Sequence, residues 1–167
     1  MKPTLPAPHL NALQEFYQGE ILGEAMFDSM LQAARNESER YKIGLMLQLE
    51  TETKARLRPF LVAEGLPLQE DPRMRPEGEQ FARELQGATW NEKMHALAES
   101  IGRTWLPRYR ELTNSLPVAL RAVGESMVAH EQALFEMARR ELAGESDRSD
   151  EPVRDLLIHR LPRPGER

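Results

Sequence analysis

The chain contains no cysteine, which excludes disulfide bonds, thiolate metal sites and a cysteine nucleophile. Basic residues are not in excess either, because 22 Lys and Arg stand against 27 Asp and Glu and leave a formal net charge of −5. A chain of this charge lacks the positive field that holds a phosphate backbone, so we expect no nucleic-acid partner. Any metal site must be built from Glu, Asp or His.

Long hydrophobic runs are absent as well. No segment approaches the ~20 apolar residues that a membrane-spanning helix requires, and residues 1–9 lack the apolar stretch of a secretory signal. We therefore expect a cytoplasmic protein with no membrane partner. Strand signals are weak, since neither sustained apolar–polar alternation nor an Asn-Gly or Asp-Gly hairpin turn occurs.

Helical periodicity, in contrast, extends through most of the chain. The 167 residues, 40% hydrophobic and 29% charged, match the size and balance of one globular domain. Apolar residues recur at helical spacing in four long segments, and prolines gather at their borders and in the middle of the chain. We predict an all-α fold with helices over residues 10–34, 43–60, 90–112 and 117–142, and a short helical piece over residues 77–85.

The connections between these helices complete the predicted architecture. Residues 65–76 are rich in proline, glycine and charge, which predicts a long connection rather than a tight turn. Pro107 should kink the third long helix or end it early, and Gly144 is placed to terminate the fourth. The chain is then a single domain, with a four-helix bundle over residues 10–143 and a tail over residues 144–167 that contains a short helix.

Charged residues interrupt the apolar stripes of the predicted helices. Glu20 and Glu24 fall within the stripe of the first helix, and Glu50 falls within that of the second. His130 and Glu131 lie inside the broad apolar arc of the fourth helix. Two unpaired carboxylates four residues apart repel each other, so burying both calls for a cation or a shared proton.

Four long helices with a long middle connection and inward-facing Glu and His resemble the ferritin-like superfamily. The resemblance covers residues 10–143 and implies an antiparallel four-helix bundle whose core binds iron or manganese. In that family, two helices supply one Glu each and the other two supply a Glu-x-x-His pair, since residues i and i+3 share a helix face. Transferred to this chain, the resemblance assigns the metal ligands to Glu20 or Glu24, Glu50, Glu99, His130 and Glu131.

The chain departs from the family pattern at two positions. Thr53 stands where a His should follow Glu50, and Met127 stands where a Glu should precede His130. A literal Glu-x-x-His does occur at residues 92–95, but a helix start and a solvated helix face explain it without a metal.

The candidate ligands also have structural explanations. Glu20 or Glu24 could pair with Lys54 or Arg56 of the second helix across the bundle. Lys54 also lies four residues after Glu50, the spacing of an exposed helical ion pair. The histidine of the fourth helix could simply bond a neighbouring carboxylate in the core.

Two functions follow from this pattern. The first is a metal-binding bundle, either a di-metal oxidoreductase or a metal-handling protein, with iron or manganese in its core. The second is a metal-free bundle of the same fold that acts as a protein-interaction or structural module, which Thr53 and Met127 favour. A haem-oxygenase-like helical fold, with His130 facing a bound ligand, is a third alternative. None of these alternatives identifies a small-molecule substrate.

Apolar residues outside the main stripe of the first helix predict self-association. Phe16, Met26 and Met30 lie beside that stripe. A small bundle with apolar surface left over commonly covers it against a second copy. We therefore expect a homodimer.

Overall fold

The computed structural model describes residues 5–165, and within them the chain is helical with no strand, which confirms the all-α prediction. Residues 1–4, part of the segment without a signal pattern, lie outside this range, as do residues 166–167 at the end of the predicted tail. The elements are α1 (Ala7–Gln32), α2 (Glu37–Ala63), α3 (Met74–Glu84), α4 (Trp90–Ser100), the π-helical turn η1 (Ile101–Trp105), α5 (Leu106–Ser115), α6 (Val118–Leu142) and α7 (Glu151–Arg154).

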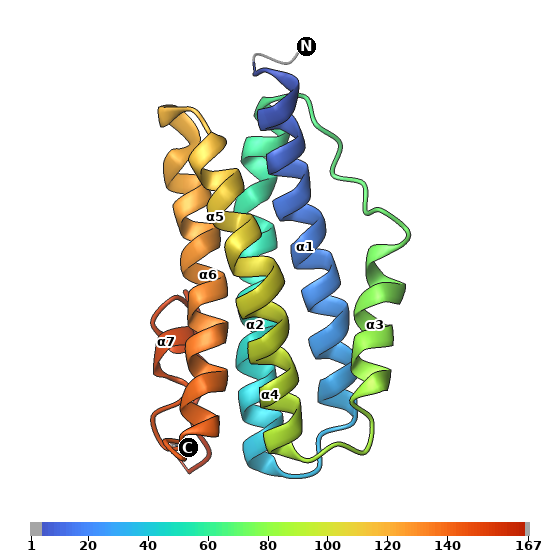
Figure 1. Cartoon of the computed structure of the whole chain (residues 1–167), viewed down its shortest axis with the longest axis vertical. Helices are drawn as coiled ribbons and strands as arrows, with labels where there is room; N and C mark the ends of the chain where they lie inside the picture. The colour runs from blue at the N-terminus through green and yellow to red at the C-terminus, as the bar shows by residue number, and fades with distance from the viewer. Residues whose placement is uncertain (1–4, 166–167) are drawn as a thin grey trace.

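Four helical rods lie side by side along the long axis of the molecule: α1, α2, the continuous α4–η1–α5 run, and α6 (Figure 1). Helix α1 packs against α2, and α6 packs against both α4 and α5. Within each of these two hairpins the rods are antiparallel, whereas α2 and the α4–η1–α5 run point in the same direction (Figure 1). Among the described residues, no helix is both long and apolar enough to cross a membrane.

The long connection between α2 and α4 explains the shared direction of these two rods. It runs back along the bundle as an extended segment followed by α3, which packs on α1 (Figure 1). Side chains of α1 hold the extended segment, since Gln14 Nε2 donates to the Pro67 carbonyl at 3.0 Å and Gln18 Nε2 donates to the Gln69 carbonyl at 3.0 Å. Gly78 lets α3 approach closely, because a Cβ there would lie 2.2 Å from the Leu22 carbonyl oxygen of α1.

The third rod does not end at Pro107, contrary to one of the two outcomes predicted for it. Pro107 lies in the first turn of α5, directly after the π-helical turn η1. Proline has no amide hydrogen to donate to the preceding turn. The rod therefore changes its hydrogen-bonding pattern before the proline and continues to Ser115.

The predicted ends of the last helices are close to those observed. Helix α6 ends at Leu142, and Gly144 follows with a φ of 79°, a conformation that glycine adopts without strain. In the tail, α7 docks on the bundle, because Val153 and Leu157 belong to the buried core.

The apolar residues that suggested self-association are covered within the chain itself. Phe16, Met26 and Met30 are all buried in the core. They leave no surplus apolar stripe on α1 for a second copy to cover, so that argument for a homodimer no longer applies. The homodimer remains a prediction for sedimentation measurements.

Candidate metal centre

Buried polar residues separate two clusters of apolar side chains along the bundle. On α2, Glu50 lies between Leu49 of one cluster and Leu57 of the other. On α6, Met127 belongs to the same cluster as Leu57, and Ala133, which follows His130, belongs to the cluster of Leu49. The polar group therefore occupies the middle of the core, far from the helix ends where charges are easily solvated.

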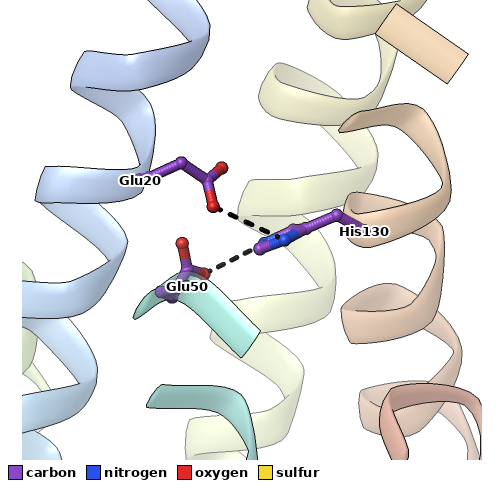
Figure 2. A group of neighbouring side chains, drawn as sticks. All are labelled: Glu20, Glu50 and His130. Carbon is purple, nitrogen blue, oxygen red and sulfur yellow. Dashed lines mark hydrogen bonds and ion pairs between the residues drawn. The ribbon is translucent and has the colours of Figure 1, made fainter. Parts of the chain in front are cut away.

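Glu20 of α1, Glu50 of α2 and His130 of α6 point toward one another (Figure 2). Each offers one ligand atom, and these three atoms all lie within 4.8 Å of one another. His130 Nε2 lies 3.2 Å from Glu50 Oε1, and His130 Nδ1 lies 3.5 Å from Glu20 Oε2. The exposed fractions of Glu20, Glu50 and His130 are 1%, 4% and 0%, so water does not solvate their charges.

Thr53 joins the group from the position where the ferritin-like pattern has a histidine. Its Oγ1 lies 3.1 Å from His130 Nδ1 and accepts a hydrogen bond from Arg56 Nη2 at 3.0 Å. Thr53 therefore orients the imidazole ring, and Nε2 remains directed at Glu50. Met127, at the second position where the chain differs from the ferritin-like pattern, is fully buried in an apolar cluster.

The carboxylates of this group have no Lys or Arg partner among the described residues. Across residues 5–165, no Lys or Arg forms an ion pair with Glu20, Glu50 or Glu131. Glu20 Oε2 is buried and accepts no hydrogen bond from the described residues. An isolated buried carboxylate is costly unless it takes a proton, a basic partner or a metal ion. Among the described residues, His130 is the one basic group in contact with Glu20 and Glu50.

Burial and mutual repulsion shift the pKa values of the group. Burial, reinforced by the nearby charges of Glu50 and Glu131, raises the pKa of Glu20 well above its usual value despite the opposing effect of His130. Burial would lower the pKa of His130, but the charges of Glu20 and Glu50 outweigh it and raise this pKa to about 10. Without a metal, the group therefore retains protons at neutral pH.

Glu131 lies next to the group and is 7% exposed. Burial raises its pKa to about 7, an effect that the charge of His130 opposes and the charge of Glu50 reinforces. Tyr109 of α5 is also buried, and burial together with the charges of Glu20 and Glu131 raises its pKa. Both residues line a cavity beside the three clustered side chains.

The cavity has a volume of about 300 Å³ and extends from Glu50 and Glu131 to Glu77 and Phe81 of α3. Its walls come from α1, α2, α3, the α4–η1–α5 run and α6, and the π-helical turn contributes Ile101, Thr104 and Trp105. A π-helical turn within an α-helix is frequently found at a functional site. Sequence reasoning predicted neither this turn nor the cavity.

Two glycines of α1 make room at the centre, and the sequence did not lead us to predict this role for them. A Cβ at Gly23 would lie 2.5 Å from the Glu50 carboxyl carbon, and a Cβ at Gly19 would lie 2.0 Å from the Tyr109 hydroxyl oxygen. The available signal was a pair of glycines inside a long helical pattern, where each costs stability and calls for a packing reason.

Glu24 is separate from the clustered group. It forms an ion pair with Lys54 and accepts a hydrogen bond from Thr51 Oγ1 at 2.8 Å. Although burial tends to raise its pKa, the bonds from Lys54 and Thr51 lower it. The structural explanation in terms of Lys54 is confirmed for Glu24, and the same lysine is not paired with Glu50.

Glu99 and the Glu-x-x-His segment lie on the surface of α4. Glu99 pairs with Arg103 at 3.0 Å, and its side chain is 48% exposed. Glu92 forms a capping box with Thr89 at the start of the helix, and His95 is exposed. The helix-start interpretation of this motif is confirmed, and the structure does not bring Glu99 into the central group.

Comparison of the chain with models of protein families, with curated proteins and with solved structures finds no match. The chemistry of the centre must therefore be argued from its own residues. Two carboxylates and one imidazole form a donor set suited to Fe(II) or Mn(II), which accept oxygen and nitrogen ligands together. The unbonded oxygen of Glu20 is the observation that such an ion would explain.

Proposed function

We propose that this protein is a ferritin-like bundle that binds one Fe(II) or Mn(II) ion through Glu20, Glu50 and His130 and uses it for redox chemistry. The supporting observation is the convergence of these three buried side chains with no Lys or Arg partner among the described residues. The shared direction of α2 and the α4–η1–α5 run, joined by a long crossover, supports the ferritin-like arrangement (Figure 1). One ion is proposed because Thr53 and Met127 replace the donors expected for a second.

Each residue of the centre has a distinct part in this proposal. Glu20 and Glu50 supply negative charge, and His130 supplies a neutral nitrogen after it loses its proton. Thr53 fixes the imidazole ring through the bond to Nδ1, so Nε2 is the nitrogen directed at Glu50. A bound iron or manganese ion would supply electron transfer to an oxidant or a substrate. The adjoining cavity gives a reactant room beside Glu50.

Metal titration of the chelator-treated protein tests this proposal. We expect one Mn(II) per chain by electron paramagnetic resonance, and a stabilisation of about 2.7 kcal/mol when free metal exceeds Kd 100-fold. Glu50→Gln and His130→Ala should abolish both effects. Glu24→Gln is the matched control, since Glu24 lies one turn from Glu20 and pairs with Lys54.

Retention of metal binding by Glu50→Gln and His130→Ala, or loss of it in Glu24→Gln, would overturn the assignment. Oxygen uptake by the Fe(II)-loaded protein, measured against the same variants, then tests the redox part of the proposal.

The metal-free module is the second candidate, and one observation favours it. Both ring nitrogens of His130 already face partners, Thr53 at 3.1 Å and Glu50 at 3.2 Å. A protonated His130 bonded in this way would hold α2 and α6 together without an ion. In that case wild type should show no metal-dependent stabilisation, whereas His130→Ala should lose several kcal/mol because Glu20 and Glu50 lose the one positive neighbour that the described residues give them.

A further inference from the structure

The charged residues that line the cavity beside the central group are all acidic. Of the 16 residues that line it, three are glutamates and none is Lys, Arg or His. Glu50 and Glu131 are buried, whereas Glu77 of α3 is exposed and marks the entrance. Most of the remaining wall is apolar, and it includes the aromatic rings of Phe27, Phe81, Trp105 and Tyr109.

Glu131 is a buried carboxylate that faces this cavity without a partner from the described residues. It is 93% removed from solvent, and it has no hydrogen bond or ion pair with any residue of the described chain. The buried carboxylates of Glu39, Glu52 and Glu141 all receive hydrogen bonds. Glu131 instead lines an open space, where a bound positive charge would compensate it.

The aromatic wall gives the positive charge a second source of stabilisation. Cations are attracted to the faces of Trp, Tyr and Phe, and the attraction is greater where water is excluded. The volume of about 300 Å³ lies at the small end of the range of ligand pockets. A hydrated metal ion would not use the apolar wall, whereas an amine with a small hydrocarbon body would use both the wall and the carboxylate.

We propose that this cavity binds a small organic amine, with its ammonium group at Glu131 and its hydrocarbon body against Phe27 and Trp105. The amine enters past Glu77, whose exposed carboxylate attracts cations to the entrance. Binding of the amine requires no metal. Its role as the reactant of the centre, placed beside Glu50, rests on the proposed function.

Three ligands of similar shape and different charge test this inference. Calorimetric titration of chelator-treated protein at pH 8 compares benzylamine with benzyl alcohol and benzoate. We expect benzylamine to bind at least about tenfold more tightly than benzyl alcohol, because a charge-assisted hydrogen bond is worth about 1.5–3 kcal/mol, and we expect no binding of benzoate. Glu131→Gln should remove the preference for the amine, and Glu99→Gln, on the exposed face of α4, should retain it.

Several results would overturn the inference: no binding of benzylamine, equal binding of the alcohol, or an unchanged preference in Glu131→Gln. Mn(II) titration of the same variants separates this inference from the metal proposal. Glu131→Gln should still bind Mn(II), and loss of Mn(II) binding would assign Glu131 to the metal and overturn the amine site. Amine binding by a wild type that takes up no Mn(II) would support the cavity and overturn only the proposed metal centre.

Discussion

Two groups of buried glutamates in this bundle have opposite surroundings. At the end of the bundle near α7, Glu141 pairs with Lys42, and Trp90 Nε1 donates to it at 2.6 Å. The hydroxyl groups of Ser146 and Ser149 also donate to Glu141. Burial tends to raise the pKa of Glu141, but these bonds outweigh it and lower the pKa.

In the middle of the bundle, Glu20 and Glu131 are buried, as Glu141 is, but they lack such donors within the described chain. Their pKa values are raised, chiefly by burial. The comparison shows that burial of a carboxylate does not by itself indicate function. A carboxylate with a full set of donors holds helices together, whereas one without them is available for a cation that the chain does not supply.

The largest expected effect is the loss of folding stability when Glu141, the buried carboxylate with many donors, is made neutral. Glu141→Gln leaves Lys42 buried without a negative partner, and such a change costs about 3 kcal/mol or more. Urea unfolding followed by circular dichroism measures this loss. Glu99→Gln, in an exposed pair, is the control and should change stability by less than about 0.5 kcal/mol. A similar small change in both variants would remove the distinction between the two groups.

The next effect is the pH dependence of metal binding by Glu20, Glu50 and His130, the central group that lacks such donors. Because the pKa of His130 is about 10 and that of Glu20 is also raised, an incoming metal must displace protons. The apparent Mn(II) affinity should therefore rise with pH, by about tenfold per unit for each proton displaced, or at least about 100-fold between pH 6 and pH 8. Competition titrations with a chelator of known affinity measure it. An affinity that is flat or that falls over this range would contradict the prediction.

Gly23→Ala should weaken metal binding by about tenfold, or 1.4 kcal/mol. The added Cβ would lie 2.5 Å from the Glu50 carboxyl carbon, so it displaces this ligand from His130. Gly44→Ala in α2 is the matched control, because its nearest contact would be Leu161 at an ordinary 3.5 Å. That change should leave metal affinity unchanged and stabilise the helix by about 0.5–1 kcal/mol. Equal affinity in both variants would show that Glu50 does not bind the ion.

The smallest effect completes the comparison with Glu141. Glu20→Gln in the metal-free protein should change stability by less than about 1 kcal/mol, because the amide resembles the protonated carboxyl that a raised pKa favours. The same variant should lose its response to Mn(II). Urea unfolding with and without metal measures both quantities. A loss as large as that expected for Glu141→Gln would mean that Glu20 is part of the structural framework.

Much of the fold could be predicted because its signals are local. Helical spacing of apolar residues and the positions of prolines placed three of the long helices within a few residues of their observed ends, whereas α2 begins at Glu37, before the predicted start at residue 43. Gly144 ends α6 as predicted. The π-helical turn was beyond this reasoning, since Pro107 indicates a disturbance of the helix but not how the backbone accommodates it. The cavity depends on contacts among several helices and has no local signal.

For the centre, the sequence by itself determined that carboxylates and an imidazole interrupt apolar stripes, because that follows from helical periodicity along each segment. It left Glu20 and Glu24 equivalent, since residues four apart share one helix face. Only the tertiary structure separated them, by setting α2 beside α1 so that Lys54 meets Glu24 and no described Lys or Arg meets Glu20. Which carboxylate receives a partner depends on the axial position and rotation of neighbouring helices, and these are decided by packing of the whole core.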